Sequence, residues 1–281
     1  MRSFALMLFA AAAAAQTPDP SPVARAWDLL TQTMQDSNPA KRVIATLAIG
    51  VVRPDAKSVP LVEGMLDDKD YGVRQAACST LGEMQSKGSV IKLKEALDDK
   101  APEVVFAAAR ALYNMNDPAG RAVLAAILIG DRPDASGLIS SSMRDAKLKL
   151  HDPKALLLIG VNQSAGLLGP FGVSVPIAEM LLKDKEASAK TAAILLLSND
   201  TSESSKEAVR AALSDKNWTV RTAAARATGN RDIAAFYGDI VPMLDDKREE
   251  VRLAAAATSI RLKQAKPRPQ QLRKPGPKAQ G

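Results

Sequence analysis

Apolar positions along most of this chain recur with the spacing of an amphipathic helix. In one stretch the residues at i, i+3, i+4, i+8 and i+11 are all apolar: Val73, Ala76, Ala77, Leu81 and Met84. This spacing places them on one face of a helix with 3.6 residues per turn. A second apolar-periodic stretch, VPLVEGML at 59–66, precedes the first, and the DDKD between them contains residues that interrupt helices. The pattern therefore predicts two helices joined by a short turn.

This pair of helices recurs about every 31 residues. Segments that align with LDDKDYGVRQAA begin at six positions: Met34, Leu66, Leu97, Leu182, Leu213 and Leu244. The intervals 66→97, 182→213 and 213→244 are each 31 residues, and the first interval is 32. One helix pair exposes an apolar face that it cannot bury alone, so successive pairs must stack to cover it. We therefore expect an all-α fold, namely an α-solenoid of stacked antiparallel helix pairs.

Pairs of alanines recur on the second helix of the repeats. They are Ala107 and Ala108, Ala192 and Ala193, Ala223 and Ala224, and Ala254 and Ala255. Such small side chains let neighbouring helices approach toward the near end of the usual separation of about 8–10 Å. We expect these pairs to lie between stacked repeats.

An aspartate in each turn and a basic residue six positions later also recur. The aspartates are Asp36, Asp68, Asp99, Asp184, Asp215 and Asp246. The basic residues are Arg42, Arg74, Lys190, Arg221 and Arg252, with Val105 in the third copy. An acid just before a helix start interacts favourably with the unpaired N–H groups there. Each basic residue can reach an aspartate of its own repeat or of the adjoining repeat. Because these positions share the period of the repeat, we interpret them as a structural ladder between repeats and not as a catalytic site.

The repeat motif resembles a known family. The pattern D-x-x-x-x-V-R-x-x-A-A, with an aromatic residue such as Tyr71 or Trp218 two positions before the V-R pair, is similar to the HEAT-like repeats of the phycobilisome-lyase type. The resemblance covers roughly residues 20–117 and 174–262, and it implies a HEAT-like superhelix. That family includes lyases, hydroxylases, nucleic-acid enzymes and non-catalytic scaffolds, so the resemblance implies an architecture and not one activity.

The middle of the chain breaks the repeat. Leu97 and Leu182 are 85 residues apart, where two repeats would need about 62. We expect 118–173 to contain a degenerate repeat and an insertion, between N-terminal repeats at 16–117 and C-terminal repeats at 174–262. Residues 155–178 carry no charged side chain, and their glycines and prolines interrupt a membrane-spanning helix. One interpretation of this segment is a helix and loop that pack on the neighbouring repeats. The functional alternatives are a shallow membrane contact or an apolar patch that contacts a partner through Leu167, Leu168, Phe171 and Val173.

The two ends have their own signals. Arg2, an apolar run over 4–15 and three alanines before Gln16 have the layout of a signal peptide at 1–15. Twelve helical residues rise about 18 Å, short of the bilayer's hydrocarbon core of about 30 Å. We therefore expect export to the periplasm or the extracellular space, with no transmembrane span after signal removal. Residues 263–281 contain six Lys and Arg, four prolines and no acid, which predicts a disordered basic tail that can adhere to an anionic surface.

Charge and residue counts exclude several kinds of chemistry. The net charge is +7, but Arg2 supplies one unit and 263–281 six, so residues 3–262 are balanced, which disfavours nucleic acid as a partner. The chain has one cysteine, Cys78, and one histidine, His151. These counts exclude a disulfide scaffold, a cysteine zinc finger and the several His-Glu pairs that hold iron in deoxyhypusine hydroxylases of this repeat class. We expect Cys78 to be a buried, inert thiol, and we expect no catalytic residue, metal or cofactor.

Together these observations predict an exported, non-catalytic scaffold that binds another protein through the surface of a solenoid. The competing hypotheses are a bilin-lyase-like or other repeat-built enzyme, and a binder of nucleic acid or an anionic surface through the basic tail. An enzyme would need a polar pocket with a perturbed acid or base. Binding through the tail would weaken steeply as salt is added.

Overall fold

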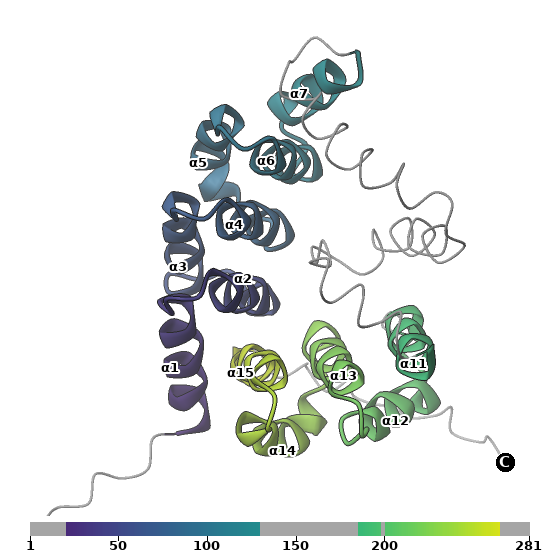
Figure 1. Cartoon of the computed structure of the whole chain (residues 1–281). Helices are drawn as coiled ribbons and strands as arrows, with labels where there is room; N and C mark the ends of the chain where they lie inside the picture. The colour runs from purple at the N-terminus through teal and green to yellow at the C-terminus, as the bar shows by residue number, and fades with distance from the viewer. Residues whose placement is uncertain (1–20, 130–184, 198–199, 265–281) are drawn as a thin grey trace, which may run out of the picture.

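A computed structural model of the chain describes residues 21–129, 185–197 and 200–264 (Figure 1). Every regular element within these ranges is a helix, so the prediction of an all-α solenoid is confirmed. The signal segment, the contacts proposed at Leu167, Leu168, Phe171 and Val173, the residues Asp184 and His151, and 265–281 all lie outside the described ranges. No helix in the described parts is long and apolar enough to cross a bilayer.

The N-terminal block, residues 21–129, consists of helix pairs. Its α-helices are α1 (Pro22–Met34), α2 (Pro39–Ala48), α3 (Ser58–Gly64), α4 (Tyr71–Glu83), α5 (Val90–Glu95), α6 (Pro102–Asn114) and α7 (Pro118–Ile129). Short 3-10 helices continue or precede them: η1 (Ile49–Val51), η2 (Met65–Asp67), η3 (Lys87–Ser89) and η4 (Ala96–Asp98). In Figure 1, α1, α3 and α5 form the outer side of a curved stack, and α2, α4 and α6 form its inner side.

The C-terminal block, residues 185–264, repeats this arrangement. Its α-helices are α11 (Lys185–Leu196), α12 (Glu203–Ala212), α13 (Trp218–Asn230), α14 (Tyr237–Ile240) and α15 (Glu249–Gln264). The 3-10 helices η6 (Ala234–Phe236) and η7 (Val241–Asp245) flank α14. Helices α12 and α14 lie on the outer side, and α11, α13 and α15 on the inner side (Figure 1).

Side chains in the turns stop one helix and start the next. Asp68 leaves the helical region with φ −64° and ψ 144°, and this ends η2. Two residues later, Asp70 caps α4 because its carboxylate accepts hydrogen bonds from the N–H groups of Gly72 and Val73. Asn217 caps α13 through the equivalent position. The turn chemistry thus defines where each second helix begins.

The apolar face expected on α4 is confirmed. Val73, Ala77 and Leu81 have no exposed surface. The helices approach closely at Gly82, where an added Cβ would stand 2.8 Å from the Cβ of Ala111 on α6. A side chain at that position would push α4 and α6 apart, so the glycine permits the close contact.

The expectation for the alanine pairs is confirmed in α6 and α15 but is wrong in α11. Ala107 and Ala108 are buried, whereas Ala192 and Ala193 are exposed. Helix α11 instead buries Ala187 and Ile194 and packs against α13. The buried face of α11 is not the one that its alanine pair marks.

The order of the repeats in space differs from their order in sequence. Helix α15 packs against α1, α2 and η1, so the last repeat lies beside the first (Figure 1). We call this contact the closure seam. Stacking of successive pairs alone does not predict it. The apolar faces at the two block ends, which include Leu30 on α1 and Leu253 on α15, are fully buried. Mutual covering of these faces removes apolar surface from water, which favours closure.

Polar contacts also join the closure seam. Arg261 on α15 donates from Nη1 to the carbonyl oxygen of Val51 at 3.0 Å. Arg53 pairs with Asp232 at 2.7 Å, and the side chain of Gln264 accepts from the backbone N–H of Arg53 at 3.0 Å. These contacts extend α15 to Gln264, two residues beyond the boundary at 262 that the basic tail predicts.

Candidate functional site

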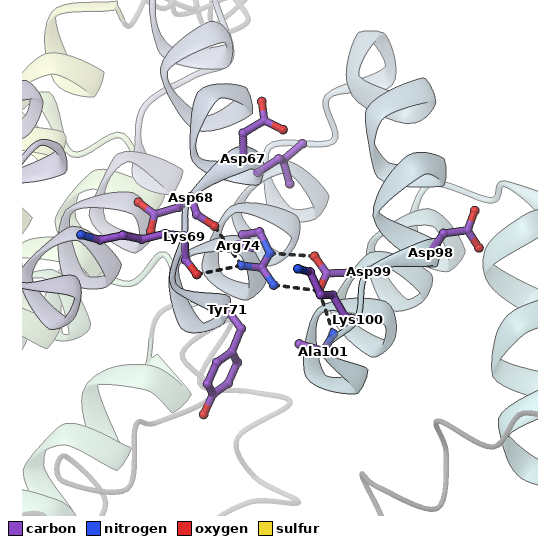
Figure 2. A pocket seen from close by; sticks show the side chains of 10 residues that line it. Asp67, Asp68, Lys69, Tyr71, Arg74, Asp98, Asp99, Lys100 and Ala101 are labelled. Carbon is purple, nitrogen blue, oxygen red and sulfur yellow. Dashed lines mark hydrogen bonds and ion pairs between the residues drawn. The ribbon is translucent and has the colours of Figure 1, made fainter.

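The recurring aspartates and basic residues form ion pairs between adjacent repeats. Arg74 on α4 donates from Nε and Nη2 to the two carboxylate oxygens of Asp99, at 2.7 and 2.8 Å (Figure 2). Its Nη1 donates to the carbonyl oxygen of Asp68 at 2.8 Å. One guanidinium therefore ties the turn of its own repeat to the turn of the next repeat.

The same arrangement recurs along both blocks. Among the described residues the rungs are Arg42–Asp68, Arg74–Asp99, Lys190–Asp215 and Arg221–Asp246. The ladder takes a different form at the closure seam. There Arg252 donates from Nη1 to the carbonyl oxygen of Asp246, and Lys41 pairs with both Asp36 and Glu249, at 3.1 and 3.5 Å. The seam thus joins the last and first repeats through a lysine bridge.

Each turn aspartate also organises its own turn. Asp99 accepts a hydrogen bond from the N–H of Ala101 at 2.8 Å, two residues later. The aspartate therefore closes the turn before the helix and does not cap the helix start directly. The hydrogen bonds from Arg74 hold the pKa of Asp99 below its ordinary value, and those to Asp99 raise the pKa of Arg74. Both charges are held by the framework, as a structural rung requires.

A shallow cavity of about 820 Å³ lies along the turn edge between these repeats (Figure 2). Arg74 and Asp99 line it together with exposed Tyr71, Lys69 and Lys100. The side chains of Arg74 and Asp99 bind each other at its centre. In the described ranges, no group of three or more His, Cys, Asp or Glu residues could hold a metal ion.

A second charged group lies on the inner face, where the two blocks meet. Glu83, at the end of α4, is under the electrostatic influence of Arg226 on α13 and Arg110 on α6. Arg226 donates to the carbonyl oxygen of Leu47 at 3.4 Å, and Arg110 donates to the hydroxyl of Ser79 at 3.1 Å. Guanidinium groups from both blocks thus act electrostatically on one carboxyl group.

The surroundings change the ionisation of this carboxyl. Glu83 keeps contact with solvent, but the protein around it desolvates the carboxyl and raises its pKa to about 7. The positive charges of Arg226 and Arg110 act in the opposite direction. Glu83 is therefore an acid whose charge changes near neutral pH.

Two exposed aromatic side chains flank this charged group. Phe106 and Tyr113 on α6 are 39% and 51% exposed. They stand four residues before and three residues after Arg110, which places all three on one face of the helix. The arrangement offers apolar contact on either side of a cation, a composition that protein interfaces favour.

Sequence reasoning identified the ladder but missed this inner-face group. Arg110 and Arg226 occupy the same repeat position, 13 residues after Leu97 and Leu213. That shared position is a signal available in the sequence. The approach of Arg226 to the N-terminal block depends on the closure of the two blocks, which the repeat pattern does not encode.

The burial expected of the lone cysteine is confirmed. Cys78 on α4 has no exposed surface, and burial raises the pKa of its thiol to about 12. A thiol with that pKa stays protonated at neutral pH, so it is a poor nucleophile.

Comparisons with known proteins found two solved structures of low similarity and one family model. Among solved structures, human deoxyhypusine hydroxylase in complex with glycerol is 20% identical, with 86% of this chain and 85% of that chain covered and a TM-score of 0.32. An engineered protein is 19% identical, with 84% and 97% covered and a TM-score of 0.28. No curated protein matches the chain. The family model for HEAT repeats matches residues 26–112 and 175–261, more than half of the chain. This protein therefore belongs to the HEAT repeat family.

Proposed function

We propose that this protein is an exported, non-catalytic scaffold that binds another protein through the surface of its solenoid. HEAT repeats suggest a capacity for protein interaction. The observation that carries the proposal is the exposure of large apolar side chains on a framework held by ion-pair rungs: Phe106 and Tyr113 on the inner face, and Tyr71 at the turn edge.

A preformed surface of this kind suits binding without chemistry. The rung side chains Arg74 and Asp99 are only 14% and 13% exposed, so adjacent repeats keep a defined spacing. A surface whose helices are already ordered loses little conformational entropy when a partner docks. Affinity then depends on a few exposed side chains and not on a reactive centre.

The finer parts of this proposal rest on the sequence. The segment before Gln16 supports export, and the V-R-x-x-A-A motif with its preceding aromatic supports the phycobilisome-lyase subtype of repeat. Export predicts that the mature protein begins near Gln16. Mass spectrometry of the N-terminal peptide from protein recovered outside the cytoplasm tests this, and an intact Met1 on that protein contradicts it.

Site-specific photo-crosslinking tests the scaffold function. A photoreactive residue is placed in the full chain at Tyr113 on the inner face, at Ile91 on the outer helix α5, or at Tyr71 on the turn edge, all of which are exposed. We expect one host protein to be captured reproducibly from envelope extract by at least one position. The adduct should disappear when unmodified protein is added as a competitor. Absence of a competable adduct at all three positions contradicts the proposal.

A further inference from the structure

We propose that the turn edge between α4 and α6 binds an arginine side chain of the partner protein. The guanidinium stacks on the ring of Tyr71 and pairs with the carboxylate of Glu103. We call Tyr71, Ala101 and Glu103 together the turn-edge site. This inference rests on the proposed scaffold function and specifies its surface and the chemistry of its partner.

The C-terminal block contains an arginine in the equivalent place, at the edge between α13 and α15. The guanidinium of Arg248 lies over the ring of Trp218, 4.6 Å from the ring centroid. It also donates from Nη2 and Nε to the two carboxylate oxygens of Glu250, at 2.9 and 3.3 Å. A ring from one repeat and a carboxylate from the next thus hold one arginine. We call these three residues the template.

The edge between α4 and α6 has the same geometry as the template edge. Arg74 donates to the two carboxylate oxygens of Asp99 at 2.7 and 2.8 Å, and Arg221 donates to those of Asp246 at 2.8 and 2.9 Å. Because the rungs match, residues at equal offsets from the rungs occupy equivalent places in the two blocks.

The ring and the carboxylate of the template both have counterparts at this edge. Tyr71 stands three residues before its rung arginine, as Trp218 does. Glu103 stands four residues after its rung aspartate, as Glu250 does, and each glutamate lies in the first turn of its helix. No ion pair between described residues involves Glu103, so its carboxylate can accept a ligand.

The arginine of the template has no counterpart at this edge. The equivalent position, two residues after the rung aspartate, is Ala101. Tyr71 is 52% exposed, whereas Arg248 covers the ring of Trp218. Both Tyr71 and Ala101 line the cavity of about 820 Å³, and the ring of Tyr71 extends away from the rung (Figure 2). The surface is therefore open where the template holds its guanidinium.

The charges at the two edges favour a cationic ligand. Around the template, residues 214–221 and 245–252 carry five acids and five Lys or Arg. The equivalent residues here, 67–74 and 98–105, carry six acids and three Lys or Arg. This edge is thus short of positive charge relative to the template, and an arginine from a partner supplies it.

The lysines at this edge do not replace the missing arginine. Lys69 and Lys100 correspond to Lys216 and Lys247 near the template, where the ring is nevertheless covered by Arg248. Among the described residues, neither Lys69 nor Lys100 lies over an aromatic ring. A guanidinium also suits the site better than an ammonium, because it stacks on a ring and binds a carboxylate through two parallel hydrogen bonds.

Fluorescence anisotropy with the full-length protein tests this inference. The probe is a labelled decapeptide of alternating arginine and glycine, and the same peptide with lysine in place of arginine is its control. We expect the arginine peptide to bind several-fold more tightly than the lysine peptide. Tyr71→Ala and Glu103→Gln should each weaken binding of the arginine peptide about two- to fivefold. Thermal unfolding of each variant confirms that it is folded.

A second variant places the missing arginine in the chain itself. Ala101→Arg should fill the turn-edge site as Arg248 fills the template, and it should weaken binding of the arginine peptide at least about fivefold. Ala211→Arg is the matched control, because it adds the same charge at an exposed position of the outer helix α12. It should leave the affinity within about twofold of the wild type, since solvent screens the added charge.

The reverse variant opens the template. Arg248→Ala should create a second site for the arginine peptide on the ring of Trp218. Unlabelled arginine peptide should therefore change the tryptophan fluorescence of this variant and not that of the wild type. The other tryptophan, Trp27, lies under the ammonium of Lys57, 4.3 Å from its ring centroid, in both proteins. An unchanged fluorescence in the folded variant contradicts the proposal.

Three other results would overturn the proposal. They are equal affinity of the wild type, Tyr71→Ala and Glu103→Gln, undiminished binding to Ala101→Arg, and equal binding of the arginine and lysine peptides. A crosslink from a photoreactive residue at position 71 to 263–281 of the same chain would also overturn it, since the chain's own arginines would then occupy the site. If these tests fail while position 113 or 91 still captures a host protein, the scaffold function stands and only this docking surface is wrong.

Discussion

Removal of the Asp99 carboxylate tests whether the rungs hold adjacent repeats together. In Asp99→Ala, Arg74 loses two hydrogen bonds of 2.7 and 2.8 Å and keeps its bonds to the preceding turn. The pair is nearly buried, with side chains 14% and 13% exposed. Loss of one partner from a fully buried pair costs about 3–5 kcal/mol. The cavity beside this rung admits solvent, so we expect a loss of about 2–4 kcal/mol in the free energy of unfolding.

A double-mutant cycle separates the pair from its surroundings. Asp99→Ala, Arg74→Met and the double variant should give a coupling energy of about 1.5–3 kcal/mol. The matched control is the ion pair between Arg25 and Asp245 at the closure seam, where the side chains are 43% and 66% exposed. For that exposed pair we expect a coupling below about 1 kcal/mol, because solvent screens the charges.

Urea unfolding followed by circular dichroism at 222 nm measures these free energies. The effect should also depend on pH. Hydrogen bonds from Arg74 lower the pKa of Asp99 in the folded state below its ordinary value. The Asp99 carboxyl therefore binds a proton less tightly in the folded state than in the unfolded state. The stabilisation is complete above the unfolded pKa and is lost as the pH falls through the lower, folded pKa.

Two outcomes would refute this reasoning. A loss below about 1 kcal/mol for Asp99→Ala at neutral pH would show that the rung is energetically neutral, as exposed pairs often are. A coupling energy no larger than that of the Arg25–Asp245 pair would show that burial in the ladder does not strengthen the ion pair. In either case this rung does not hold its two repeats together.

Three further predictions concern packing and reactivity. Gly120→Ala should lower the free energy of unfolding by at least about 2 kcal/mol, because the new Cβ would stand 2.3 Å from the backbone nitrogen of Tyr113. Gly64→Ala is the control and should be neutral or stabilising, because no atom lies within 4 Å of the new Cβ. Equal free energies of unfolding in urea for the two variants would contradict the packing at α7. Ala224→Glu should cost several kcal/mol, about 3 or more, because the site is fully buried, and an unchanged melting temperature would show that this face of α13 is misassigned. Cys78 should react with a thiol-specific disulfide reagent only at the rate of unfolding, and rapid reaction in the native protein would contradict its burial and raised pKa.

Local, periodic features are readable from the sequence alone. The helix pairs follow from apolar spacing and from turn residues that act on their immediate neighbours, as Asp70 does on Gly72. The rung between Arg74 and Asp99 is also readable, since a contact between adjacent repeats recurs wherever the motif recurs. Such interactions can be predicted without knowing the global path of the chain.

The position of the last repeat against the first was decided only by the tertiary structure. The contact of Arg261 with Val51 joins residues 210 positions apart, and no periodicity relates them. The same closure brings Arg226 on α13 to the carbonyl oxygen of Leu47 on α2, 179 positions away in the sequence. A repeat motif specifies how one unit meets the next, but which apolar ends of a finite stack cover each other depends on the surface that the whole folded chain can bury.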